Sequence, residues 1–324
     1  MTSSKPVLRH LSLRQWRYAL AAAERNNVTV AAAALNVSQP AISAAIAELE
    51  AHYGRALFVR RKGQGISPTP FGRRLFARAR HLLAEAADIA STGLAGDAAE
   101  DPIGGEVVLA CHHDLAPYYL PRLLTEVHRL HPAIVVRFRE GDFDAIARSM
   151  EEDSIDLVIS YDVAFDRSLA IIELGALPLS ALLPAAHPLA RQRKIALRQL
   201  AAENFVISNQ PHTWQHVMDL FALHGLPAPG VATRVDGFEL QRGLVANGHG
   251  VALAYTRPAG DRSYDGAELA IRDIADAIPP QKILLVRNPT NPPSRACQAV
   301  MRCAIDWFNQ NQGRPGQSRL RRRG

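Results

Sequence analysis

Hydrophobic residues in the first 55 positions recur at spacings of three and four, the period of an α-helix. The first such stripe consists of Leu13, Trp16, Leu20 and Ala23. A second, short helix is expected over "VAAAALN", with Thr29 as its cap and Asn36 at its end. Ser38 can cap a third helix that has Pro40 in its first turn. The buried stripe of this third helix would be Ile42, Ile46 and Leu49. Short helices joined by a tight turn are typical of a helix-turn-helix, whose second helix enters the DNA major groove.

One long helix is expected from Phe71 to Ser91. Its hydrophobic residues alternate spacings of four and three, as in a coiled-coil seam. They are Phe71, Leu75, Ala79, Leu82, Ala86 and Ile89. Such a helix packs either on its own domain or on a second copy of the chain. The segment "STGLAGDAAEDPIGG" after it predicts a flexible link.

After Gly105 the pattern changes to short hydrophobic runs that alternate with helical stretches, which is typical of α/β organisation. The expected strands are "EVVLAC", "IVVRFRE", "DLVIS", "SALLPA", "FVIS" and "GVALAY". The expected helices are "LPRLLTEVHRL", "FDAIARSMEE", "HTWQHVMDLFALHG" and "FELQRGLVANG".

The charge is distributed unevenly along the chain. The total is +6, but residues 1–95 carry +8, residues 96–312 carry −7 and residues 313–324 carry +5. A basic head on an acidic body indicates that the head binds a polyanion such as nucleic acid. The alternative is a charged surface that only contacts solvent.

The composition is that of a globular protein, with 48% hydrophobic and 21% charged residues. No hydrophobic run is as long as the roughly 18 residues of a membrane helix, and the first residues lack the hydrophobic core of a secretion signal. Three widely spaced cysteines do not form a disulfide framework. These features predict a cytoplasmic protein that binds no membrane.

The segment "FVRRKGQGISPTP" follows the third helix and places Arg60, Arg61 and Lys62 beside a glycine-bearing turn. A basic wing that contacts the sugar-phosphate backbone has this composition. The small side chains of the third helix permit close approach to base edges, and Gln39 and Ser43 can read bases there. The alternative is an ordinary small helical domain.

These residues resemble the LysR-type bacterial transcriptional regulators. The resemblance rests on "VAAAALNVSQPAISAAIAELEAHYGRALFVRR" and "ISPTPFG", and the layout extends it from residue 11 to about 310. It implies that Gln39, Pro40 and Ser43 lie at the major groove, and that Thr29, Ser38 and Arg60 lie near phosphates. The chain departs from the family pattern at Ala44 and Ala45, where polar or basic residues are usual, so specificity is expected to depend more on Gln39, the wing and DNA deformability.

The resemblance implies an all-α winged helix-turn-helix with a linker helix, followed by an α/β effector domain of two lobes like those of periplasmic solute-binding proteins. The expected parts are the DNA-binding domain 1–69, the linker helix 70–92, a flexible link 93–105, the effector domain 106–312 and a disordered basic tail 313–324. Lobe I would contain 106–161 and 275–312, and lobe II 162–274. The linker helix would dimerise the chain through Phe71, Leu75, Leu82 and Ile89.

The resemblance also implies a homodimer, then a dimer of dimers, that binds double-stranded DNA at a dyad-symmetric operator and contacts RNA polymerase. No catalysis and no cofactor are expected. Instead, a small-molecule effector would bind between the two lobes.

Two strand ends of the body carry polar residues that suit a ligand site. "EVVLAC" leads into Cys111, His112 and His113, and "FVIS" leads into a second group. The second group is Ser208, Asn209 and His212, with Tyr161 and Tyr255 at the lobe edges. Histidines beside free helix N–H groups predict a carboxylate or a similar small anion as the effector.

Other interpretations of "CHHD" remain open. It can be a metal site, although no second ligand pair supports this. It can hold a thiolate activated by a histidine, as in a cysteine enzyme. A regulator that senses redox state through Cys111 is a closer alternative. Cys297 and Cys303 lie about 9 Å apart along an expected helix, too far to form a disulfide.

Overall fold

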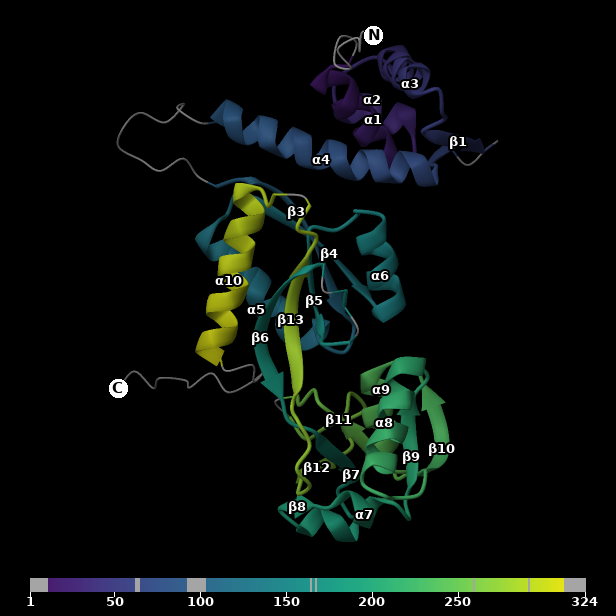
Figure 1. Ribbon diagram of the computed structural model, residues 1–324, viewed down its shortest axis with the longest axis vertical. Helices are drawn as coiled ribbons and strands as arrows, with labels where there is room; N and C mark the ends of the chain where they lie inside the picture. Colours follow the sequence, from purple (N-terminus) through teal and green to yellow (C-terminus); the bar gives the residue numbers. More distant parts are fainter. Residues whose placement is uncertain are drawn as a thin grey trace, which may run out of the picture.

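The computed structural model describes residues 11–61, 65–91, 103–163, 165–166, 168–258, 260–290 and 292–311 (Figure 1). Three expectations therefore lie wholly or mostly outside the described residues: the position of Lys62, the flexible link and the basic tail. For Arg61 only the backbone is described.

The N-terminal head contains three helices and a hairpin. They are α1 (Leu13–Arg25), α2 (Val28–Ala34), α3 (Gln39–Tyr53), β1 (Phe58–Arg61) and β2 (Gly65–Pro68). Helices α2 and α3 bend by 115° relative to each other, within the range of a helix-turn-helix. Ile42, Ile46 and Leu49 are buried in the core of the head, as predicted. The expected winged helix-turn-helix is therefore present.

A side chain caps the start of each of the helices α2 and α3. The cap of α3 was predicted correctly, and the cap of α2 was not. Ser38 caps α3 as expected, since its hydroxyl accepts a hydrogen bond from the Ala41 N–H. Thr29 was the wrong cap for α2. Asn27 is the cap, because its side-chain oxygen accepts from the N–H groups of Thr29 and Val30.

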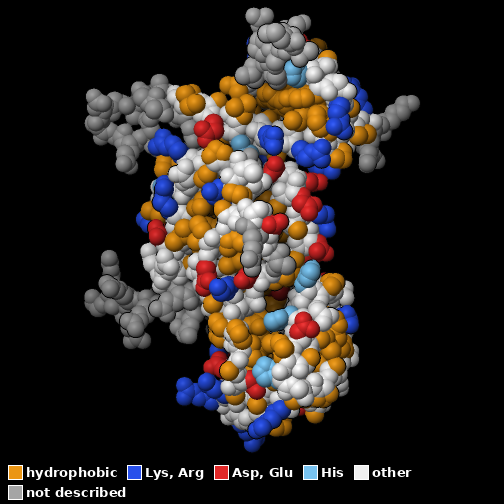
Figure 2. Space-filling model, in the orientation of Figure 1, with side chains coloured by type: hydrophobic (Ala, Val, Ile, Leu, Met, Phe, Trp, Pro, Cys, Tyr) orange, Lys and Arg blue, Asp and Glu red, His pale blue; other side chains and the backbone are white. Residues whose placement is uncertain are grey.

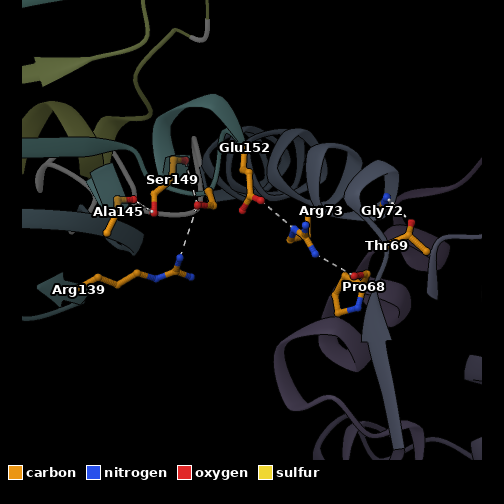
Figure 3. A network of polar contacts seen from close by, with 9 residues as sticks. Pro68, Thr69, Gly72, Arg73, Arg139, Ala145, Ser149 and Glu152 are labelled. Carbon is orange, nitrogen blue, oxygen red and sulfur yellow. Dashed lines mark hydrogen bonds and ion pairs between the residues drawn. The ribbon is translucent and has the colours of Figure 1, made fainter. Parts of the chain in front are cut away.

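Helix α4 (Pro70–Ser91) lies between the head and the rest of the molecule (Figure 1). Its first half packs on the head through Phe71, Leu75, Phe76 and Ala79. Arg73 donates a hydrogen bond to the Pro68 carbonyl at 3.1 Å and forms an ion pair with Glu152 of the following domain, also at 3.1 Å (Figure 3). Helix α4 therefore contacts both the wing and the body.

The body consists of two α/β lobes arranged one after the other along the long axis of the molecule (Figure 1). Lobe I has a sheet in the order β4-β3-β5-β13-β6. Its strands are β3 (Gly105–His112), β4 (Ile134–Gly141), β5 (Leu157–Tyr161), β6 (Ala170–Leu177) and β13 (Gln281–Arg287). Helices α5 (Ala116–Leu130) and α10 (Arg295–Asn311) cover one face, and α6 (Phe143–Glu151) covers the other.

Lobe II has a sheet in the order β11-β7-β12-β8, and a bridge between Phe205 and Val251 joins it to the pair β10-β9. Its strands are β7 (Ser180–Pro184), β8 (Lys194–Ile195), β9 (Asn204–Ser208), β10 (Gly230–Val235), β11 (Ala252–Ala254) and β12 (Leu269–Ile274). Its helices are η1 (Pro188–Arg191), α7 (Leu197–Leu200), α8 (Pro211–Leu223) and α9 (Phe238–Ala246).

The expected lobe boundary after residue 161 is wrong. Strand β6, at 170–177, pairs antiparallel with β13 and so completes the sheet of lobe I. The chain therefore enters lobe II only after Leu177, and it returns between Ile274 and Gln281. Strand β6 was not among the strands expected from the sequence, and its pairing with β13 could not be read from the local pattern.

In the described part of the chain, no single helix is long and hydrophobic enough to cross a membrane. Helices α2 and α3 satisfy the same criterion only when taken together, and they are the bent pair of the head.

Candidate functional site

The surface of the head presents the front of α3. Gln39, Pro40 and Ala44 are exposed there, and Ser43 is half-buried. Ser38, at the start of the helix, is exposed, and so is Thr29 on α2. This surface carries no ionised group among these residues, so it can approach base edges without desolvating a charge.

Arg60 lies on the hairpin β1-β2 and has an exposed side chain. Glu50 holds the hairpin against α3, because its Oε1 accepts hydrogen bonds from the N–H groups of Leu57 at 2.7 Å and Phe58 at 3.2 Å. Gly72 permits the close packing of α4, since a Cβ there would lie 2.2 Å from the Leu57 carbonyl oxygen. Lys and Arg side chains are visible on the head and along α4 in Figure 2.

The four residues expected to dimerise the chain occupy two environments. Phe71 and Leu75 are half-buried against the head. Leu82 is 50% exposed and Ile89 is 73% exposed. The second half of α4 therefore presents large hydrophobic side chains that nothing in the described chain covers fully.

A cavity of about 350 Å³ lies between the two lobes. Four of the eight residues expected to bind the effector line it, namely Tyr161, Ser208, His212 and Tyr255. Figure 2 shows histidine and acidic side chains at the surface where the lobes meet. The size and the position between two lobes are typical of a small-molecule site.

The other four expected residues do not line the cavity. Cys111 and His112 are buried in lobe I. The Nε2 atom of His113 lies 2.5 Å from the side-chain nitrogen of Gln210, which belongs to lobe II. Asn209 donates a hydrogen bond to Asp236 at 3.0 Å. These contacts hold the lobes and their loops in place.

Further polar contacts join the lobes. The Tyr118 hydroxyl of α5 donates to Glu239 of α9, and Glu239 also accepts from Arg242 at 2.7 Å. His212 of α8 lies 3.8 Å from Asp144 of α6. Because the contacts connect both lobes at the cavity, opening of the lobes must break them.

The ligand atoms of His112, His113 and Asp114 lie within 4.8 Å of one another. Two of these side chains already have protein partners: His112 Nδ1 accepts from the Asp114 N–H at 3.3 Å, and His113 contacts Gln210. Burial, and to a smaller extent the neighbouring His113, lower the pKa of His112 to about 3, so its imidazole is neutral at pH 7. The cluster is therefore a packed part of the lobe interface.

The three cysteines are free and buried. Burial raises the pKa of the Cys111 thiol well above its ordinary value and that of Cys297 to about 12. A thiol needs to ionise in order to react, so these environments disfavour the thiolate chemistry that a Cys111 redox sensor or a cysteine enzyme requires.

Several residues of the cavity were not found from the sequence. Phe143 follows the end of β4 and contacts both His112 and His212 through ring contacts. Trp214 and His216 lie on the first turns of α8, and His216 contacts the Tyr255 hydroxyl at 2.7 Å. The rule that ligands bind at strand ends could have indicated Phe143, whereas the inward face of α8 depends on packing.

Comparisons with known proteins agree with this architecture. Residues 13–73 match the family model "Bacterial regulatory helix-turn-helix protein, lysR family", and residues 100–309 match the model "LysR substrate binding domain". The two models together cover the head and both lobes.

The chain is also similar to individual regulators over most of its length. It is 27% identical over 298 residues to the HTH-type transcriptional regulator CfxR of Cupriavidus necator, covering 91% of this chain and 92% of that one. It is 30% identical over 250 residues to the regulator CysB of Burkholderia cenocepacia, covering 75% and 77%.

Among solved structures, HinK, a LysR family transcriptional regulator from Pseudomonas aeruginosa, has a TM-score of 0.60 and 26% identity, covering 93% of this chain and 98% of that chain. A full-length OxyR variant from the same organism has a TM-score of 0.71 at 21% identity, covering 91% and 98%, which shows the shared fold. The chain therefore belongs to the LysR family and is a transcriptional regulator with an N-terminal DNA-binding domain and a C-terminal effector-binding domain.

Proposed function

We propose that this regulator binds a dyad-symmetric operator as a homodimer, with α3 of each copy in the major groove of one half-site. The exposed, uncharged front of α3, in the same domain as the exposed Arg60 of the wing, carries this proposal, because the head combines close access to bases with a charge for the phosphates. In this arrangement Gln39, Pro40, Ser43 and Ala44 face the bases. The phosphate contacts come from Thr29, Ser38, Arg60, Arg61 and Lys62.

The dimer forms through the second half of α4. Leu82 and Ile89 are exposed there at a spacing of seven residues, so they fall on one face of the helix. A matching surface on a second copy would bury both side chains, and two-fold symmetry of the protein would give the two-fold symmetry of the operator. Association of two dimers, contact with RNA polymerase and a cytoplasmic location follow from the family resemblance.

The effector binds in the cavity between the lobes, where Tyr161, Ser208, His212 and Tyr255 lie. A ligand that contacts both lobes favours one relation between them. Lobe I contacts α4 through the ion pairs Glu152–Arg73 and Asp156–His81. A change in the lobes therefore reaches the helix that positions the two heads, which links effector binding to DNA binding.

The experiment is an electrophoretic shift of DNA upstream of the protein's own gene, at two salt concentrations. The wild type should give a specific shift that weakens as salt rises. Ala44→Glu places a negative charge on the front of α3 and should abolish the shift, whereas Ala202→Glu makes the same change on an exposed turn of lobe II and should leave it intact. Equal binding by both variants would refute the assignment of α3.

A further inference from the structure

The cavity between the lobes is lined by carboxylates without a matching cation. Its wall includes the aspartates Asp114, Asp162, Asp219 and Asp236, and no Lys or Arg among the described residues. Burial raises the pKa of Asp114, so the negative charge is assigned to the other three aspartates, whose side chains are exposed. We propose that the effector carries a positive charge and an aromatic or other flat hydrophobic group, that is, a small amine. This inference rests on the proposed use of the cavity as the effector site, and it replaces the anion expected from the sequence.

Among the described residues, the two aspartates of lobe II accept hydrogen bonds from neutral side chains. The side-chain amide of Gln215 donates to Asp219 at 2.8 Å, and that of Asn209 donates to Asp236 at 3.0 Å. Neutral donors stabilise a carboxylate without cancelling its charge. Asp219 and Asp236 therefore give the cavity a negative potential that a cationic ligand would neutralise.

Two positive contributions oppose the negative potential of the aspartates, and both are smaller than it. The N-termini of α8 and α9 also reach the cavity, and each carries about half a positive charge that is confined to the first turn. Asp236 stands directly before the Gly237 cap of α9 and offsets one of them. The imidazole of His216 is held neutral, because burial lowers its pKa below the ordinary value. The formal charges of the cavity wall are therefore mostly those of the carboxylates.

The hydrophobic wall suits the rest of such a ligand. The rings of Phe143, Tyr161, Trp214, Phe238 and Tyr255 line the cavity. Aromatic faces attract cations, and the attraction is stronger where the contact is desolvated. The Trp214 ring already attracts a cation within the protein, since the guanidinium carbon of Arg234 lies 5.0 Å from the centroid of this ring. Carboxylates beside aromatic rings form the combination that recognises an amine.

The size of the cavity limits the ligand. A volume of about 350 Å³ is at the lower end of the range for small-molecule pockets, and it accommodates a bicyclic ring with a short side chain. Tryptamine and indole-3-acetate have this size and nearly the same shape, but they differ in the sign of their charge. They are therefore a matched pair of probes.

The test is isothermal titration of the full chain with each probe at pH 7.5. Tryptamine should bind at least tenfold more tightly than indole-3-acetate. The double variant Asp219→Asn/Asp236→Asn keeps the side-chain shapes and should remove most of this preference. Asp306→Asn makes the same change on an exposed position of α10, outside the cavity, and should keep it.

Tighter binding of indole-3-acetate, binding of neither probe, or an unchanged preference in the double variant would overturn the inference. The DNA shift of the same wild-type preparation separates this result from the proposed function. If the protein shifts its operator but binds indole-3-acetate more tightly, only the inference of an amine effector is refuted. If the protein binds tryptamine more tightly but shifts no DNA, only the proposal of operator binding is refuted.

Discussion

The contact between Glu50 and the wing gives the most direct prediction from the head. Glu50 of α3 accepts hydrogen bonds from the N–H groups of Leu57 and Phe58, and both of these residues are buried. In Glu50→Ala the two N–H groups lose their acceptor where water cannot easily replace it. Each hydrogen bond to a charged group contributes about 1.5 kcal/mol at the lower end of the usual range, which suits a half-buried carboxylate.

The two bonds together then stabilise the closed wing by about 3 kcal/mol, and partial access of water reduces this to about 2 kcal/mol. At 1.4 kcal/mol per factor of ten, the loss of about 2 to 3 kcal/mol corresponds to roughly 30- to 140-fold faster exchange of these amides through local opening of the wing. Hydrogen exchange of the full chain, followed by mass spectrometry of peptides that contain residues 54–61, measures it. Operator affinity should fall in the same variant, because Arg60 is carried by β1.

Two further variants test whether the effect comes from the acceptor atoms of Glu50. Glu50→Gln retains a side-chain carbonyl acceptor and should give a smaller effect. Glu48→Ala removes an exposed carboxylate from the same helix, which accepts a hydrogen bond from the Gln15 side chain, and should leave the exchange of the wing unchanged. Unchanged protection of Leu57 and Phe58 in Glu50→Ala would refute the reasoning.

Three further outcomes are expected. Arg60→Ala should weaken binding to all DNA sequences alike and reduce the slope of log K against log salt by about one, measured by fluorescence anisotropy; a sequence-dependent loss would contradict a phosphate contact. The double variant Leu82→Glu/Ile89→Glu should sediment as a species of half the wild-type mass, and an unchanged mass would exclude this seam. Burial lowers the pKa of His112 from 6.5 to about 3, so its contribution to stability is present above pH 6.5 and is lost as the pH falls toward 3. Thermal unfolding should therefore show about 2 kcal/mol less stability at pH 5 than at pH 7, and His112→Gln should flatten this dependence; an equally steep dependence in the variant would assign it elsewhere.

The head could be predicted in detail because its signals are local. A cap, a proline in the first turn and a helical stripe identify α3 within a dozen residues, and Ser38 caps it as expected. The cap of α2 was missed because Asn27 and Thr29 are both good caps, two residues apart, and only the position of the first turn decides between them. Such ambiguities shift a boundary without changing the fold.

The body was predictable in class but less so in connectivity. The assignment of β6 to lobe I depends on its pairing with β13, more than a hundred residues later, and a sequence pattern contains no information on such a partner. Strand β10 was missed because most of its residues are exposed, so it lacks a hydrophobic run.

The candidate effector site shows the same limit. The strand-end rule predicted Ser208, and Tyr161 was expected at a lobe edge; both line the cavity between the lobes. Strand β3 is buried on both faces, so alternation could not reveal that Cys111 and His112 are both buried in lobe I. The acidic character of the cavity arises from aspartates on separate elements and becomes visible only once the lobes are assembled.

This regulator is expected to bind a symmetric DNA sequence. Selection of bound sequences from a random double-stranded library by the full-length protein, followed by sequencing, measures this preference. We expect enrichment of two inverted half-sites whose centres lie on the same side of the duplex, and weaker base preference with Gln39→Ala. Recovery of DNA with no enriched sequence, or of a single half-site without symmetry, would contradict it.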